Sequence, residues 1–230
     1  MQPVKVLIDT GAPLTFATPP GKAPTMDKGS VDAKDFGGDK KSLEVHLALL
    51  KQLKLTDPEH SPVISLTRVE QIGYDHFDAV FVPGGHAPMQ GRATSPEMGT
   101  LLRTFHKEHK LTALVCHGPV ALISALPDPV GYTQKLEKNP SAKTPDWIYA
   151  SYRMTSFSNP EEEASTAVLD GGRMKFTPQT AGAVFSMAPL KWQTHVVEDR
   201  ELITGQNPAS ALAPGQRLAE RLSASEKKAD

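Results

Sequence analysis

The amino-acid sequence predicts an α/β fold in which a mainly parallel β-sheet carries helices on both faces. Segments with strand-like and helix-like patterns alternate along the chain, which is the order that such folds require. Two short runs, residues 78–83 and 111–115, are almost entirely apolar, as expected for parallel strands buried on both faces. Glycines follow the first run, and a stretch of helical composition follows the second. Both boundaries are typical of the end of a strand.

One further strand and two helices are expected in the first half of the chain. Residues 13–18 are predicted to be a strand that stops at the Pro-Pro-Gly sequence behind it. The spacing of leucines predicts a helix over residues 42–55, with Ser42 as its N-cap. Residues 96–109 are predicted to form a helix whose buried face consists of Met98, Leu101, Leu102 and Phe105.

The middle of the chain has a weaker pattern. Residues 118–126 have helical composition, and residues 153–157 are predicted to be a strand. Residues 160–163 suit the first turn of a helix, because carboxylates there face the positive end of the helix dipole. Residues 25–41, which are rich in Gly, Asp and Lys, are expected to be weakly structured.

A pair of strands and a last helix are expected near the end of the chain. Residues 195–197 and 201–203 are predicted to be two strands joined by a turn. Asn207 and Pro208 supply an N-cap and a proline for the first helical position of the last helix. That helix is expected to end near residue 222, and residues 223–230 are expected to form a polar tail.

Length and composition exclude several classes of protein. The 230 residues allow one or two domains, and we assign a single domain to residues 1–222. The balance of 25 basic and 26 acidic residues argues against a dedicated nucleic-acid binder. A single cysteine excludes an intrachain disulfide and a Cys-rich zinc site. No apolar run approaches the roughly 20 residues of a membrane span, and neither a signal-peptide pattern nor a nucleotide-binding fingerprint is present. We therefore expect a cytoplasmic protein without a membrane partner, a nucleic-acid partner, a metal or a cofactor.

Cys116 is the strongest candidate for a catalytic residue. It lies where the buried run 111–115 passes into a segment of helical composition. Free N–H groups and the dipole at a helix N-terminus favour an anion, so we expect a lowered thiol pKa and a nucleophilic thiolate at Cys116. Gly118, two residues later, matches the small residue of a nucleophile elbow. The alternative is an inert buried thiol, because free cysteines are among the most buried residues.

Two neighbouring features could assist such a nucleophile. His117 follows it directly and could act as its base, although it could equally face solvent at the start of a helix. Gly84, Gly85 and His86 follow the buried run 78–83. Adjacent glycines let backbone N–H groups form an oxyanion hole, and the alternative is an ordinary glycine turn.

Two other kinds of ionisable residue bear on the predicted site, namely acidic residues and the remaining histidines. One of Glu161, Glu162 and Glu163 could orient the imidazole as the third member of a catalytic triad. The alternative is the general preference of helix starts for acidic residues. Six further histidines lack the spacing of metal ligands and are expected to be structural or exposed: His46, His60, His76, His106, His109 and His195.

Three stretches in this order, residues 79–89, 113–119 and 202–210, resemble the ThiJ/PfpI superfamily, and most closely its glyoxalase III and chaperone-like branch. The resemblance implies a flavodoxin-like three-layer sandwich that often forms a homodimer. It implies Cys116 as the nucleophile, His117 as the base and Glu162 as the acid, with Glu161 the nearest rival. The residues that it implies for binding the substrate and its oxyanion are Gly84, Gly85, His86 and Gly118.

One departure from the superfamily concerns the beginning of the chain. Its members usually have a strand and a helix ahead of the region that matches here, and that helix carries a Glu that contacts the nucleophilic sulfur. Residues 3–11 resemble the second half of that helix, with Gly11 as its C-cap. We therefore expect this strand and Glu to be absent and neighbouring strand edges to be exposed. The alternative, which composition alone favours, is that residues 4–9 are the first strand of the sheet.

The resemblance implies a glutathione-independent glyoxalase that converts methylglyoxal to lactate through a hemithioacetal on Cys116. Two alternatives stay open at this point. The chain could be a holdase chaperone or stress protein with little turnover, which the absent Glu would favour. It could also be a peptidase or amidase, because the same Cys-His pair can cleave amides. The sequence does not decide whether the chain removes glycation from proteins.

Overall fold

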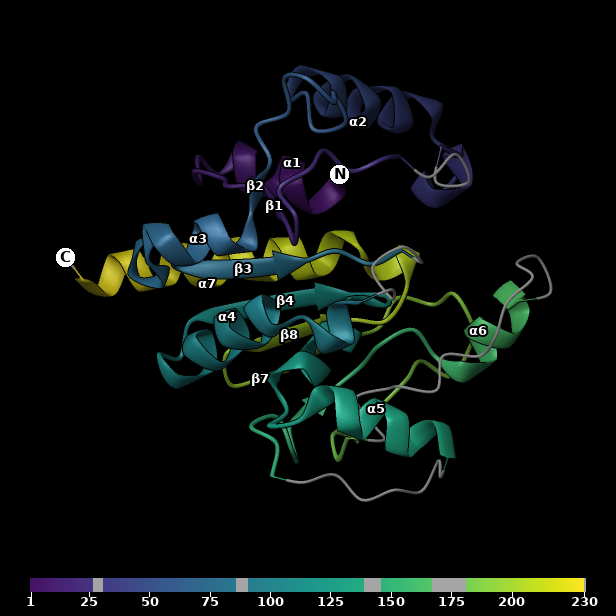
Figure 1. Cartoon of the computed structure of the whole chain (residues 1–230). Helices are drawn as coiled ribbons and strands as arrows, with labels where there is room; N and C mark the ends of the chain where they lie inside the picture. Colours follow the sequence, from purple (N-terminus) through teal and green to yellow (C-terminus); the bar gives the residue numbers. More distant parts are fainter. Residues whose placement is uncertain (27–30, 86–90, 139–145, 167–180, 230) are drawn as a thin grey trace.

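A computed structural model describes most of the chain (Figure 1). The described residues are 1–26, 31–85, 91–138, 146–166 and 181–229.

Four strands form the central sheet, in the order β3 (Ala79–Val82), β4 (Leu111–Val115), β8 (Leu202–Gly205) and β7 (Val196–Asp199). The first three are parallel to one another, and β7 pairs antiparallel with β8. The predicted α/β fold is therefore confirmed, with a sheet that is mixed at one edge. In the described part of the chain, the other edge of β3 has no strand partner.

Helices cover both faces of this sheet and make three layers (Figure 1). On one face, α1 (Gln2–Asp9) and α7 (Leu212–Ala229) pack against the strands. The apolar cluster there consists of Leu7, Leu111, Ala113, Ile203, Leu218 and Ala219. On the other face, α4 (Pro96–Lys107) and the 3-10 helix η6 (Gly118–Ala125) bury the opposite side chains of the same strands. Alternate residues of β4 serve the two faces, since Ala113 belongs to the first cluster and Leu114 to the second.

The helix α4 begins and packs as its sequence predicts. The Ser95 hydroxyl accepts a hydrogen bond from the Met98 N–H at 3.2 Å, and Pro96 takes the first helical position. The predicted face of Met98, Leu101, Leu102 and Phe105 is buried.

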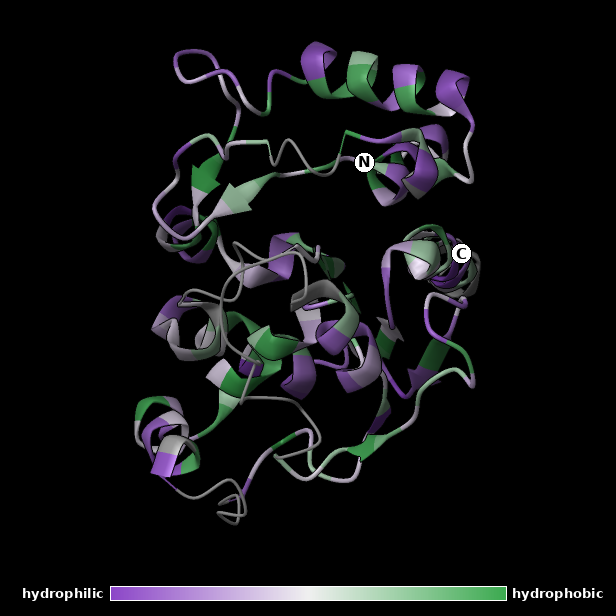
Figure 2. Ribbon diagram, turned by 90° about the vertical axis from the view of Figure 1, so that its right-hand side faces the viewer, coloured by the Kyte–Doolittle hydropathy of each residue, from purple (hydrophilic) through white to green (hydrophobic). Residues whose placement is uncertain are grey.

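The helix α2 (Lys40–Gln52) lies apart from the central sheet. Figures 1 and 2 show α2 at one end of the molecule, and none of its residues is buried. Its N-cap is Asp39 rather than Ser42, because the Asp39 carboxylate accepts the Lys41 N–H at 2.9 Å. The strand expected at 13–18 is reduced to β1 (Ala17–Thr18), which pairs with the equally short β2 (Ile64–Ser65). Short helices complete this half: η2 (Ala33–Phe36), α3 (Leu66–Ile72), η3 (Tyr74–His76) and η5 (Arg92–Thr94).

The first residues form a helix, so the alternative of a first strand at 4–9 is wrong. Thr10 ends α1, and Gly11 follows with a φ of +82°, where its missing side chain removes the steric cost. The α1 backbone lies so close to α7 that a Cβ on Gly215 would come within 2.8 Å of the Pro3 Cα. This close packing against α7 holds α1 in the helical layer beside the sheet rather than in the sheet.

Elements after η6 differ from expectation mainly in length. The strand expected at 153–157 ends early, as β5 (Arg153–Met154), and pairs in parallel with β6 (Val184–Phe185) in a separate small sheet. The helix expected to end near residue 222 begins at Leu212 and continues to Ala229. The remaining helices are α5 (Pro129–Lys138), α6 (Asn159–Thr166) and η7 (Pro208–Ser210).

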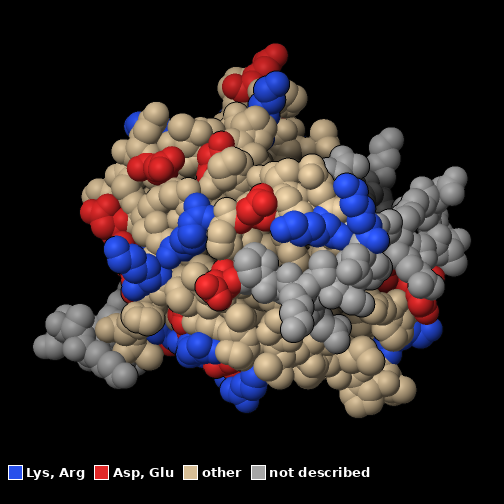
Figure 3. All heavy atoms as spheres, turned by 60° about the horizontal axis from the view of Figure 1, so that its bottom comes forward, with Lys and Arg blue, Asp and Glu red and all other residues tan. Residues whose placement is uncertain are grey.

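Two surface properties bear on partners. Basic and acidic side chains are interspersed on the face shown in Figure 3, so that face offers no continuous basic surface. Among the described helices, none combines the length and apolar character of a membrane span.

The contact between α4 and η6 makes a testable prediction at Gly99. A Gly→Ala change inside a helix normally stabilises by about 1 kcal/mol. A Cβ at Gly99 would overlap the Ser124 carbonyl oxygen of η6. We therefore expect Gly99→Ala to lower the free energy of unfolding by about 1–3 kcal/mol, measured by urea denaturation. In the control Gly131→Ala, the atoms nearest to the new Cβ belong to the Asp128 side chain, whose rotation gives up one exposed hydrogen bond from the Gly131 N–H, so a smaller change is expected. Equal effects of the two substitutions would contradict this account.

Candidate active site

Cys116 occupies the bend between β4 and η6. Its φ of +61° is in the left-handed region, which is uncommon for residues other than glycine. The Cys116 N–H donates to the Gly205 carbonyl at the end of β8 at 2.8 Å, and the Phe157 N–H donates to the Cys116 carbonyl at 3.0 Å. The bend is therefore held from two sides by segments that are distant in the sequence.

Two glycines make room for this bend. A Cβ on Gly84 would come within 2.5 Å of the Cys116 Cβ and 3.3 Å of its Sγ. A Cβ on Gly118 would come within 2.6 Å of the Val82 carbonyl oxygen. Both positions need glycine so that the end of β3 can approach the bend closely. Their implied contact with substrate stays a prediction.

His117 connects the thiol to a carboxylate. Its Nδ1 lies 3.6 Å from the Cys116 Sγ, and its Nε2 lies 2.8 Å from the Glu162 Oε2. Because the carboxylate is an acceptor, it places the ring proton on Nε2 and turns the lone pair of Nδ1 toward the sulfur. The imidazole is 1% exposed and the Glu162 residue 7%, so the pair is shielded from water. His117 therefore does not face solvent, and α6 brings in Glu162 from 45 positions further along the chain.

The other two acidic residues of α6 point elsewhere. Glu161 is fully buried and accepts its hydrogen bonds from Ser158, Trp192, Gln206 and Asn207 rather than from His117. Glu163 is exposed.

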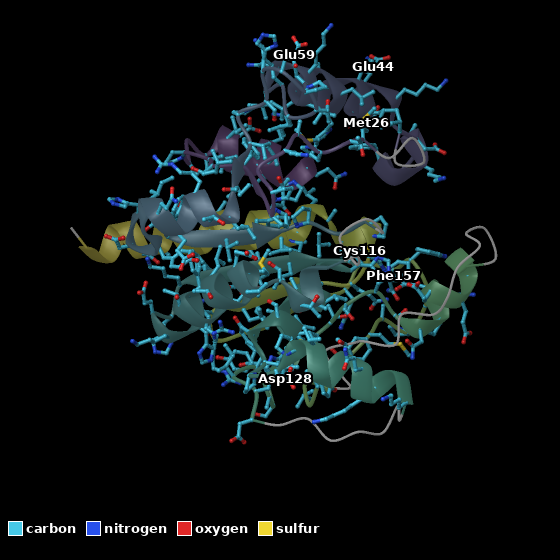
Figure 4. The ribbon with its side chains drawn as sticks, viewed as in Figure 1. Met26, Glu44, Glu59, Cys116, Asp128 and Phe157 are labelled. Atoms are coloured by element: carbon cyan, nitrogen blue, oxygen red, sulfur yellow. The ribbon has the colours of Figure 1, made fainter. Side chains whose placement is uncertain are left out.

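An aromatic stack that the sequence interpretation missed supports the histidine. The Phe157 ring lies 4.5 Å from the His117 ring, and the Trp192 ring lies 5.7 Å from Phe157, between centroids. Figure 4 shows Phe157 beside Cys116 at the end of the sheet nearest α6, and the two share one apolar cluster with Val115. A sequence signal for Phe157 was its place at the end of the strand predicted at 153–157, whereas Trp192 had none.

The electrostatics of the thiol differ from the sequence-based expectation. Burial raises the pKa of the Cys116 thiol to about 12, while the backbone N–H groups of Gly85 and His117 donate to the sulfur and act in the opposite direction. The expected lowering of this pKa is therefore wrong, because burial destabilises the thiolate by more than the two amide hydrogen bonds stabilise it. In the described part of the chain, no carboxylate hydrogen-bonds the sulfur.

Gly85 contributes its backbone N–H to the sulfur, with a φ of +103°. His86 lies outside the described residues. Among the described residues, no cluster of three His, Cys, Asp or Glu side chains has the arrangement of a metal site.

Comparison with known proteins identifies relatives. Residues 36–127 match the DJ-1/PfpI family. The chain is 26% identical over 152 residues to the glutathione-independent glyoxalase hsp3101 of Schizosaccharomyces pombe, covering 64% of this chain and 57% of the relative. It is 27% identical over 154 residues to the protein/nucleic acid deglycase HchA of Pseudomonas aeruginosa, covering 64% and 47%. The chain thus spans about half the length of the curated relatives it matches.

A solved structure shows the same fold. The crystal structure of glyoxalase III from Candida albicans superimposes with a TM-score of 0.64 at 17% identity, covering 94% of this chain and 83% of that one. The family match and the curated relatives confirm the resemblance to the ThiJ/PfpI superfamily.

The raised pKa of Cys116 predicts a pH dependence of alkylation. Iodoacetamide reacts with the thiolate, so a thiol with a raised pKa needs more alkaline solution to react. We expect the rate on the native protein to keep rising well above pH 8.5, the ordinary thiol pKa being about 8.5. Since Cys116 is the only cysteine, mass spectrometry of a single adduct gives the rate directly. The same chain in urea is the control, and a native midpoint at or below the midpoint in urea would contradict the prediction.

Proposed function

Residues 36–127 match the DJ-1/PfpI family, and on that premise we propose that the chain is a glutathione-independent glyoxalase that converts methylglyoxal, a 2-oxoaldehyde, to lactate. The observation that carries the proposal is the buried chain of contacts from the Cys116 sulfur through His117 to Glu162. A nucleophile, a base and a carboxylate that orients the base are the parts that nucleophilic catalysis needs. The relative named as a glutathione-independent glyoxalase supports the choice of reaction.

The first step is addition of the thiol to the aldehyde. The raised pKa of Cys116 leaves it protonated before substrate binds, so His117 Nδ1 removes the thiol proton as the sulfur attacks the aldehyde carbon. The imidazolium that forms donates from Nε2 to Glu162, which stabilises its charge. The backbone N–H of Gly85, already directed at the sulfur, is available to the developing oxyanion. The proton then passes from His117 to that oxygen and completes a hemithioacetal.

The second step moves a proton between two carbons. Neutral His117 removes the proton from the former aldehyde carbon, the electron pair forms the carbon–carbon double bond of an enediol, and His117 passes that proton to the ketone oxygen. His117 then removes the proton of the hydroxyl on the first carbon and delivers it to the neighbouring carbon, so that the first carbon becomes the carbonyl of a thioester. Water then attacks this carbonyl, so lactate leaves and the thiol is restored. A well-placed base contributes about 10²–10⁴-fold to each proton transfer.

Replacement of the nucleophile tests this function. We expect the wild-type protein to form D-lactate from methylglyoxal without glutathione. In Cys116→Ala and His117→Asn, kcat/KM should fall by about 10²-fold or more, because the first loses the covalent bond and the second the proton transfer. A D-lactate dehydrogenase assay gives the rate. The matched control is Glu163→Gln, which removes an exposed charge from the same helix and should leave the rate within about twofold. Equal turnover by Cys116→Ala and wild type would overturn the proposal.

A second candidate function is suppression of aggregation. Its supporting observation is a group of large apolar side chains exposed within residues 184–192. Leu190 is 70% exposed, and the others are Val184, Met187 and Trp192. Exposed apolar surface of this kind binds the apolar segments of unfolded chains.

The two functions separate by substitution. If the apolar segment acts as a holdase, Leu190→Asp should reduce protection of an aggregating client protein in a light-scattering assay by about half or more, because a charge disfavours apolar contact. Cys116→Ala should leave that protection intact. Loss of protection in Cys116→Ala, or full protection by Leu190→Asp, would count against a holdase. Amine release from peptides would instead indicate the peptidase or amidase that the sequence leaves open.

Several expectations of the sequence stay predictions. They are the homodimer, the absence of nucleic-acid partners and cofactors, the cytoplasmic location and the domain boundary at residue 222. Sedimentation analysis of the purified chain tests the first of them.

A further inference from the structure

Glu161 is a buried carboxylate that the proposed reaction does not use. The residue is fully buried, and five groups donate hydrogen bonds to its two oxygens. Oε2 accepts from the Ser158 N–H at 3.1 Å, the Ser158 hydroxyl at 2.7 Å and the Gln206 amide at 2.9 Å. Oε1 accepts from the Trp192 N–H at 2.9 Å and the Asn207 amide at 2.7 Å. A carboxylate has about four lone-pair sites, so this one is saturated with donors.

These donors come from three separate parts of the chain. Ser158 immediately precedes α6, Trp192 lies in the segment between β6 and β7, and the two amides follow β8. The amides are themselves fixed, because the Gln206 Oε1 accepts the Ala188 N–H at 2.8 Å and the Asn207 Oδ1 accepts the Ser210 N–H at 3.0 Å. Glu161 therefore ties the start of α6 to the end of the central sheet.

All five donors are neutral groups, and their hydrogen bonds favour the ionised form of Glu161. Burial alone would raise the pKa of its carboxyl, yet the hydrogen bonds from Ser158, Asn207, Trp192 and Gln206 together hold that pKa below its usual range. The group is thus ionised at neutral pH and binds its donors with charge-assisted hydrogen bonds, which are stronger than neutral ones.

The position of Glu161 in α6 connects this anchor to the candidate active site. It directly precedes Glu162, whose Oε2 is the partner of His117 Nε2. Consecutive residues of a helix share one rigid backbone, so fixing Glu161 fixes the direction in which Glu162 projects. Trp192, one of the donors, also packs on Phe157, which packs on the His117 ring. The shorter connection from Glu161 to the imidazole runs through its neighbour Glu162.

We propose that Glu161 is a positioning residue that acts through Glu162 to hold the His117 imidazole against the Cys116 sulfur. Its consequence for turnover rests on the proposed function, but its consequence for the His117–Glu162 hydrogen bond does not. Glu161 touches neither the sulfur nor the imidazole, so its effect reaches the reaction through geometry. The two adjacent acids thereby have different tasks, one as the anchor and one as the partner of the base.

The test reads the hydrogen bond itself. A ring N–H proton bonded to a buried carboxylate gives a proton NMR signal far downfield, and His117→Asn identifies the signal by removing it. We expect Glu161→Gln, which replaces an acceptor of five donors by a group that presents its own N–H₂, to abolish the signal or shift it upfield. Ser158→Ala removes one donor but keeps the charge, so it should shift the signal by less and serves if Glu161→Gln does not fold. Glu163→Gln is the matched control and should leave the signal in place.

Kinetics of methylglyoxal conversion supply the second readout. If Glu161 acts through Glu162, Glu161→Gln should lower kcat/KM about tenfold in the wild-type background and less than about twofold in the Glu162→Gln background. An unchanged NMR signal in Glu161→Gln, or equal losses of kcat/KM in both backgrounds, would overturn the proposal. A lower melting temperature alone would show a structural role only and would also overturn it. If neither the wild type nor any variant converts methylglyoxal, the proposed function fails. The NMR result then still decides the role of Glu161.

Discussion

The bend at Cys116 is the constraint on which the rest of the site depends. A left-handed conformation at a residue other than glycine costs of order 1 kcal/mol, so the surrounding structure must hold it. The end of β8 accepts the Cys116 N–H, and the segment after β5 donates to its carbonyl. Glycines at positions 84 and 118 let the end of β3 close around the same bend. The carboxyl ends of the parallel strands β3, β4 and β8 therefore meet at the thiol, where sites in such sheets are expected.

Burial gives this thiol its chemical character and its dependence on His117. A thiol in water is partly ionised near neutral pH, whereas burial raises the pKa of Cys116 far above that range. In the proposed reaction the thiolate therefore arises by proton transfer as the sulfur attacks rather than beforehand. Only a base in contact with the sulfur can supply that transfer, and the His117 Nδ1 is at 3.6 Å. The same burial keeps water away from the His117–Glu162 pair, which strengthens the electrostatic support of a transient imidazolium.

The sequence predicted correctly the elements that depend on residues close together in the chain. The two continuously apolar runs became β3 and β4, and the apolar spacing of α4 gave its buried face, because each depends on residues a few positions apart. The strands β1 and β5 proved to be only two residues long, since a strand extends only as far as its partner does. The contact of Phe157 with His117, the contact of Trp192 with Phe157, and the pKa of Cys116 depend on groups that only the fold brings together.

The contrast between Glu161 and Glu162 shows most clearly why residue type does not determine role. Both are glutamates in the first turn of α6, and sequence alone left either as the partner of the base. Glu161 meets five neutral donors, so its lone pairs are occupied and its charge is already balanced by fixed dipoles. Glu162 meets the imidazole, a partner whose charge changes during proton transfer. In the proposed reaction, only the second therefore stabilises a charge that appears during proton transfer. A saturated carboxylate therefore suits an anchor, and a carboxylate paired with a titratable ring suits catalysis, although the two are adjacent and chemically identical.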